Sequence, residues 1–147
     1  MFLGTDSSNR LTNDNVFSMQ VIQTANAPAP VGPYNQAIAA NGFLFVAGQI
    51  ALDPASMTLV GDDDVAVQTR QVMGNLQAVL TEAGCQWQDV VKTTVFLSDM
   101  ENFAAVNAIY AEYFDEAIAP ARACVEVSRL PKDVLVEIDC VAALPSN

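Results

Sequence analysis

The chain has 147 residues, 52% of them apolar, and seventeen aspartates and glutamates against six lysines and arginines give it a net charge of −11. This charge has the wrong sign for neutralising phosphates over an extended surface, which argues against nucleic acid and anionic membranes as main partners. The absence of histidine removes the commonest general base and most transition-metal sites, and the three widely spaced cysteines are typical of reduced thiols in a cytoplasmic protein.

The first 18 residues are polar and have no hydrophobic periodicity. We expect them to form a flexible N-terminal extension, 1–18, ahead of a single domain over residues 19–147. They contain neither a basic leader nor a sustained apolar segment, so a secretory signal is not predicted. No stretch approaches the roughly 18 uncharged apolar residues of a transmembrane helix, and no membrane partner is predicted.

Three strands are predicted in quick succession after this extension. Short apolar runs lie at residues 21–24, 37–40 and 43–50. Asn41 and Gly42 separate the second run from the third, and this dipeptide between apolar runs is a strong hairpin signal. The third run begins with FLFV, which is apolar on both faces and therefore indicates a central strand.

The next predicted element is a helix over about residues 65–83. Its apolar residues recur at a helical spacing and fall on one stripe. Asp63 or Asp64 can cap the N-terminus of this helix, and Gly84 suits its C-terminal end.

A strand over residues 90–97 precedes a second helix, which is predicted at roughly 99–116. Ser98 and Glu101 form a capping-box pattern at the start of that helix. Its apolar stripe consists of Phe103, Val106, Tyr110 and Phe114.

Two strands, at about 122–128 and 134–143, complete the chain and are joined by the turn RLPKD. The helices connect strands, so we predict an α/β (α+β) fold: a two-layer sandwich in which a mixed sheet carries two helices on one face. Two helices leave the other face of the sheet open. We therefore expect several copies of the chain to associate, with cyclic symmetry.

Arg122 and Glu137 are charged residues within these last two strands. If the strands form a hairpin around residues 130–133, the faces that carry Arg122 and Glu137 come together, with Glu137 opposite Glu126. The structural interpretations are an ion pair for Arg122 and a solvent-facing position for Glu137. The functional ones are a carboxylate clamp, because a guanidinium matches a carboxylate in shape, and a general acid or base with a raised pKa.

Four other positions have both a structural and a functional interpretation. Tyr34, in a turn, is either a packed aromatic or an active-site phenol, and Gly48, inside a strand, indicates either a bulge or close approach of a ligand to the backbone. Asn107 lies on an apolar helix stripe, where its amide needs partners. Cys124 is a candidate nucleophile without a histidine to activate it. The aspartates at 62–64 are better explained as a turn and helix cap than as a metal site.

Four segments together resemble the RidA/YjgF family of small enamine/imine deaminases. They cover about residues 20–144 and read GPYNQAI, GFLFVAGQI, VVKTTVFLSDMENFAAVNAIYAEYF and PARACVEVSRLPKDVLVEI. The resemblance implies a chorismate-mutase-like fold and a homotrimer with clefts between its subunits. It also implies hydrolysis of 2-imino and 2-enamino acids, such as 2-iminobutanoate and 2-iminopropanoate or 2-aminoacrylate, to 2-oxo acids and ammonia, without a cofactor or metal.

The same resemblance implies a role for each candidate residue. Arg122 would bind the substrate carboxylate, Glu137 would position the hydrolytic water, and Tyr34 would shape the catalytic pocket. The substrate-binding positions would be Arg122, Gly48, Asn107 and Cys124. Ala47 stands where many members have serine, so any hydroxyl contact there is absent.

Two alternatives to a deaminase remain at this stage. One is a non-catalytic module that binds a 2-oxo acid through the same arginine. The other is an endoribonuclease or translation inhibitor, as suggested for some relatives of the family, and the net charge of −11 disfavours it.

Overall fold

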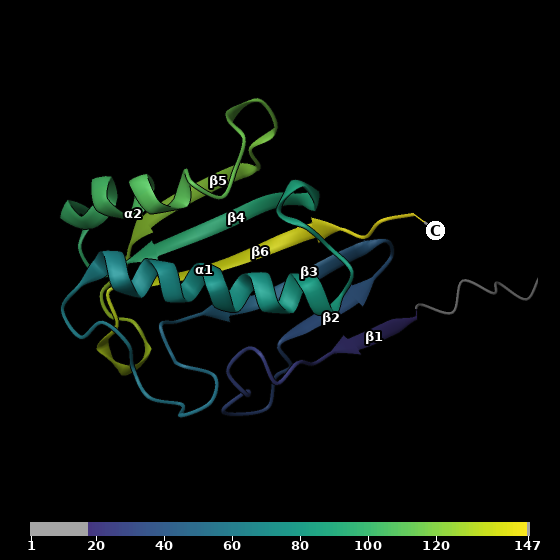
Figure 1. Ribbon diagram of the computed structural model, residues 1–147, viewed down its shortest axis with the longest axis horizontal. Helices are drawn as coiled ribbons and strands as arrows, with labels where there is room; N and C mark the ends of the chain where they lie inside the picture. The colour runs from purple at the N-terminus through teal and green to yellow at the C-terminus, as the bar shows by residue number, and fades with distance from the viewer. Residues whose placement is uncertain (1–17, 147) are drawn as a thin grey trace, which may run out of the picture.

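The computed structural model describes residues 18–146, and the predicted extension over residues 1–18 therefore lies outside the described residues apart from Ser18. The predicted order of three strands, a helix, a strand, a helix and two strands is confirmed (Figure 1). The elements are β1 (Met19–Ile22), β2 (Ala37–Ala40), β3 (Phe43–Gln49), α1 (Val65–Glu82), β4 (Val90–Leu97), α2 (Phe103–Tyr110), β5 (Ala121–Glu126) and β6 (Val136–Ala143).

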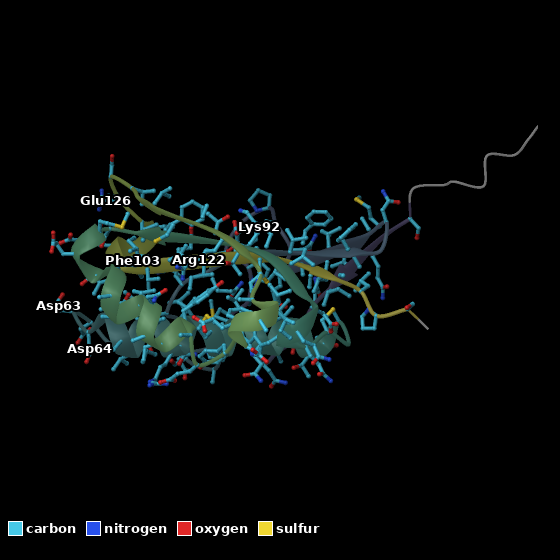
Figure 2. The ribbon with its side chains drawn as sticks, turned by 90° about the horizontal axis from the view of Figure 1, so that it is seen from above. Asp63, Asp64, Lys92, Phe103, Arg122 and Glu126 are labelled. Atoms are coloured by element: carbon cyan, nitrogen blue, oxygen red, sulfur yellow. The ribbon has the colours of Figure 1, made fainter. Side chains whose placement is uncertain are left out.

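The six strands form one mixed sheet in the order β1-β2-β3-β6-β4-β5. Only β4 and β5 pair in parallel, and the other neighbours are antiparallel. Both helices lie on the same side of this sheet, as predicted (Figures 1 and 2). The core fills the space between the two layers and includes Leu44, Met73, Leu76, Val95 and Ile138, each at most 1% exposed. Burial of each such side chain stabilises the fold by about 1.5–3 kcal/mol.

Helix α1 begins and ends where its sequence predicts. The Asp64 carboxylate accepts hydrogen bonds from the backbone N–H groups of Ala66 and Val67 at 3.0 and 3.2 Å, which satisfies donors that the first helical turn leaves free. Gly84 follows the helix with a φ of 77°, a conformation that residues with a Cβ rarely adopt.

No helix within residues 18–146 combines the length and the apolar character that crossing a membrane requires.

Helix α2 is shorter than predicted, and the predicted capping residue is wrong. The segment begins with a 3-10 turn over Met100–Asn102, and the Asp99 carboxylate caps that turn by accepting from the Glu101 N–H at 2.9 Å. The N–H of Ser98 instead donates to the Leu135 carbonyl at 3.2 Å and so continues the sheet. Tertiary hydrogen bonding thus overrides the local capping pattern.

The face of the sheet opposite the helices is open and partly apolar, as expected. Direct neighbours across a sheet point to the same side, so one row on this face runs across all six strands. The row consists of Val21, Ile38, Phe45, Val141, Lys92 and Ala121. Phe45 is 50% exposed and Val21 is 48% exposed, although each lies within a strand. This open face is a candidate surface for association with another copy.

The predicted hairpin between the last two strands is wrong. Strand β4 lies between β5 and β6, so that Arg122 pairs with Thr93 and Glu137 pairs with Phe96. Thr93 and Phe96 are three residues apart on one strand and therefore point to opposite faces. Arg122 accordingly lies on the helix side of the sheet and Glu137 on the open side. The predicted facing of Glu137 and Glu126 is also wrong, because Glu126 pairs with Leu97.

Candidate active site

The Arg122 side chain lies against α2 near the edge of the sheet (Figure 2). Its Nη1 donates a hydrogen bond to the Asn107 Oδ1 at 2.8 Å. Its Cζ lies 4.8 Å from the centre of the Tyr110 ring and 5.6 Å from the centre of the Phe103 ring. These three partners are spaced four and three residues apart, so they line one face of α2. We call Phe103, Asn107 and Tyr110 the arginine cradle.

The arginine cradle is electrically neutral. Within residues 18–146 the ion pairs of the chain are Arg70 with Glu112 and Arg129 with Asp133, and Arg122 takes part in neither. The interpretation of Arg122 as a structural ion pair therefore has no support among the described residues. An amide and two ring faces hold the guanidinium without an ion pair, and a cavity of about 410 Å³ that Glu116 also lines lies beside it. A guanidinium held in this way is suited to an anionic ligand.

Glu137 belongs to a second cluster, on the other face of the sheet. A cavity of about 300 Å³ brings Tyr34, Gly48 and Glu137 together. Its apolar wall includes Val31, Ile50, Leu52 and Pro131, and Lys132 is the cation at its edge. The Tyr34 hydroxyl accepts from the Val31 N–H at 3.2 Å, which fixes the phenol within its own turn. The cavity thus combines a carboxylate and a phenol with a mostly apolar surface.

The environment of Glu137 favours its protonated form. Burial raises the pKa of the Glu137 carboxyl above its ordinary value of 4.5, and the neighbouring Asp139 carboxylate raises it further. A carboxylate with a raised pKa is a stronger base than an exposed one. Glu137 is therefore a better acceptor of a proton from water than an exposed glutamate would be.

The bulge predicted at Gly48 is present, whereas the approach of a ligand to its backbone stays a prediction. The register of β3 against β6 shifts between Val46 and Gln49, so the glycine lies in a bulge. A Cβ at Gly48 would lie 3.0 Å from the Glu137 Cδ and 3.3 Å from its Oε1. The missing side chain therefore makes room for the carboxyl group of Glu137.

Cys124 shares the helix-side face of β5 with Arg122 but is not an activated thiol. It is half-buried and packs against the core. Burial raises the pKa of the Cys124 thiol more than the nearby Arg122 lowers it. The thiol is therefore protonated at neutral pH, and Cys124 can contribute shape or a weak hydrogen bond near the guanidinium.

Sequence reasoning did not identify Tyr110, Phe103 or Lys132 as site residues. The two aromatics lie on the same helix stripe as Asn107, and that spacing was the available signal. Lys132 adopts a φ of 56° in the turn before β6, which no sequence pattern predicts. A larger groove of about 500 Å³, lined partly by Trp87 and Tyr113, contains none of the predicted site residues.

Comparisons with known proteins agree with the motifs. The family model for endoribonuclease L-PSP matches residues 24–144. A RutC family protein of Synechocystis sp. is 75% identical over 129 residues, which is 88% of this chain and 99% of that protein. A 2-iminobutanoate/2-iminopropanoate deaminase of Salmonella typhimurium is 46% identical over 84% of this chain and 96% of the relative.

Solved structures show the same fold. The crystal structure of Escherichia coli TdcF with bound serine is 39% identical, covers 84% of this chain and 98% of its own, and superposes with a TM-score of 0.78. RidA from the Antarctic bacterium Psychrobacter sp. superposes with a TM-score of 0.80 at 39% identity. The chain therefore belongs to the endoribonuclease L-PSP family, which is the RidA/YjgF family that its motifs resemble.

Proposed function

We propose that this protein is a hydrolytic deaminase of reactive 2-imino and 2-enamino acids, such as 2-iminobutanoate and 2-iminopropanoate. The observation that carries the proposal is the Arg122 guanidinium, which lies in a neutral cradle and forms no ion pair among residues 18–146, since 2-imino acids are carboxylates. A relative that bears this activity in its name is 46% identical. We further propose that residues 19–147 act as one domain, in the cytoplasm.

The proposed reaction needs one base and one carboxylate anchor. Arg122 holds the substrate carboxylate, and Glu137 takes a proton from a water molecule as the water oxygen bonds to the imine carbon. The electron pair of the C=N bond moves to nitrogen, which takes the proton from Glu137. In the resulting tetrahedral intermediate the hydroxyl proton then passes to nitrogen through Glu137 as the C–N bond breaks, so that ammonia leaves and the carbonyl group of the 2-oxo acid forms. Because the chain has no histidine, a carboxylate with a raised pKa supplies the base.

The proposed site takes its two halves from different copies of the chain. Arg122 and Glu137 lie on opposite faces of the sheet, so a single chain does not bring them to one substrate. The open apolar face, with Phe45 half exposed, offers a surface for association. We propose a homotrimer in which each cleft combines the arginine cradle of one subunit with the Tyr34, Gly48 and Glu137 cavity of its neighbour.

The test is an assay coupled to threonine dehydratase, which releases the imine of 2-oxobutanoate. Purified protein is expected to accelerate the appearance of 2-oxobutanoate beyond the spontaneous rate. Arg122→Ala and Glu137→Gln are each expected to slow turnover by about 10²–10⁴-fold. Arg70→Ala is the matched control, because it removes an arginine that pairs with Glu112 at 2.7 Å and belongs neither to the arginine cradle nor to the Glu137 cavity. Full activity of Arg122→Ala in an intact oligomer would exclude the carboxylate anchor.

A 2-oxo-acid-binding module is the second candidate, because the same arginine cradle suits binding without turnover. A relative named as a putative regulator, from Lactococcus lactis, is 46% identical. Saturable binding of 2-oxobutanoate without acceleration of the dehydratase reaction would favour this module. RNA cleavage that is lost in Arg122→Ala would instead favour the endoribonuclease interpretation, which the charge of −11 opposes.

A further inference from the structure

Tyr110 connects the Arg122 guanidinium to the interior of the protein. One face of its ring lies 4.8 Å from the Arg122 Cζ. Its hydroxyl lies 2.7 Å from the Thr93 Oγ1, in a buried hydrogen bond in which either oxygen can donate. The ring also packs at 4.7 Å on the Phe114 ring, centre to centre. Tyr110 is only 6% exposed, although the guanidinium that it contacts is exposed.

Thr93 is a polar residue at a position where the sheet otherwise carries apolar side chains. It lies in the centre of β4, is 1% exposed, and pairs directly with Arg122 on one side and Cys140 on the other. A buried hydroxyl without a partner is costly, so the Thr93 hydroxyl requires the Tyr110 hydroxyl in this core. The hydrogen bond in turn determines where the Tyr110 ring lies relative to β5. Thr93 and Arg122 are therefore linked through the backbone pairing and through the ring.

We propose that Tyr110 is a positioning residue for Arg122 and that the Thr93 hydroxyl holds its ring in place. This inference rests on the proposed function, in which Arg122 binds the substrate carboxylate. A ring face attracts a guanidinium without neutralising it and without occupying its N–H groups. Asn107 uses Nη1, so the remaining N–H groups of the fork stay available to a carboxylate. A cradle made of a carboxylate would hold Arg122 as firmly but would compete with the substrate.

The experiment measures 2-oxobutanoate binding by calorimetry rather than turnover. Tyr110→Leu is expected to weaken binding by roughly tenfold, within the range that loss of a cation–π contact gives. Tyr110→Phe keeps the ring but removes its hydrogen bond to Thr93, so it is expected to weaken binding by about threefold, less than Tyr110→Leu does. The double variant Thr93→Val with Tyr110→Phe removes both hydroxyls, so it leaves no unpaired buried group and is expected to restore the thermal midpoint that Tyr110→Phe lowers.

Two controls separate positioning from general loss of stability. Val106→Ala removes a side chain that is 3% exposed from the core side of the same helix, and it is expected to lower the thermal midpoint without changing 2-oxobutanoate affinity. In an Arg122→Ala background, Tyr110→Leu is expected to have no further effect on binding, because the residue that it positions is absent.

The outcomes distinguish this inference from the proposed function. Wild-type affinity in Tyr110→Leu, or an equal loss in Val106→Ala, would overturn the positioning role and leave the deaminase proposal standing. If Tyr110→Leu weakens binding further in the Arg122→Ala background, its effect is structural and the inference is also overturned. A wild-type protein that neither binds 2-oxobutanoate nor accelerates the dehydratase reaction would refute the proposed function itself.

Discussion

Mixed oligomers of two inactive variants test whether the active site spans two copies of the chain. Arg122→Ala and Glu137→Gln each leave one half of the site intact. In the chain, the first residue lies on the helix side of the sheet beside Thr93 and the second on the open side beside Phe96. If each site combines the two residues from neighbouring copies, a site is intact only between two different variants. The Glu137→Gln subunit then supplies Arg122, and its Arg122→Ala neighbour supplies Glu137.

The expected recovery follows from counting sites in a cyclic oligomer. When the two variants are unfolded, mixed in equal amounts and refolded, about one quarter of the sites carry both native residues, whatever the number of subunits in the ring. The dehydratase-coupled assay should therefore recover about one quarter of wild-type turnover from two preparations that are each inactive. A site within one chain would recover none, because every chain carries one substitution.

A second mixture distinguishes the two arrangements by a different ratio of activities. Equal amounts of the wild type and the Arg122→Ala, Glu137→Gln double variant should retain about one quarter of the activity if sites span two copies, and about one half if each chain holds its own site. The one-chain alternative has a concrete basis, since Lys132 lies at the cavity of Glu137 and offers another cation. No recovery in the first mixture together with one half in the second would refute the two-copy site, provided that native mass spectrometry detects the mixed oligomers.

Four further predictions concern single substitutions. Asn107→Asp sets a carboxylate where the amide oxygen now lies 2.8 Å from the Arg122 Nη1, and the new ion pair is expected to weaken 2-oxobutanoate binding about fivefold in calorimetry, the ratio for about 1 kcal/mol at an exposed site. Gly48→Ala brings a methyl carbon to 3.0 Å from the Glu137 Cδ, so the carboxyl group of Glu137 must move. Turnover is expected to fall about tenfold, whereas the thermal midpoint should change little, because only the end of a side chain and not the backbone is displaced. Burial, and then the Asp139 carboxylate, raise the pKa of Glu137 above 4.5. As the pH is lowered, turnover is therefore expected to begin to fall before pH 4.5 is reached, and Asp139→Asn should shift this loss of turnover to lower pH. The pKa of Glu137 is higher in the folded than in the unfolded state, so above the unfolded-state pKa its ionisation destabilises the fold. Glu137→Gln should therefore raise the thermal midpoint at about pH 7 but not at about pH 4.

Each of these substitutions has a matched control or an opposing outcome. Gln77→Glu makes the same amide-to-carboxylate change at an exposed position of α1, outside the arginine cradle, and should leave binding unchanged. Gly74→Ala, where an added Cβ meets nothing within 4 Å, should leave turnover unchanged. Unaltered binding in Asn107→Asp would show that the charge of Arg122 is not what the ligand recognises. An acid limb that does not move in Asp139→Asn would assign it to a group other than Glu137.

The sequence by itself determined the order of the elements, the bounds of α1 and the chemistry available to this protein. Periodicity, the Asp64 cap and Gly84 predict α1 correctly because helix formation depends on residues within one or two turns of each other. The open face of the sheet can also be predicted from the order of the elements, because two helices can cover only one face of one sheet. The lack of histidine and the PAR and VEI motifs direct attention to Arg122 and Glu137 without any coordinates.

The tertiary structure alone decided how the last three strands pair, and thereby how the candidate residues are divided between the two faces of the sheet. Sequence neighbours β5 and β6 read as a hairpin, yet β4 lies between them, since its alternate side chains complete the core beneath both helices. Strand pairing is non-local, so no pattern within β5 or β6 predicts the partner. That single insertion moves Arg122 and Glu137 to opposite faces and brings Thr93 beside Arg122. Local sequence thus indicates the candidate residues, whereas packing across the sheet decides which of them one chain can bring together.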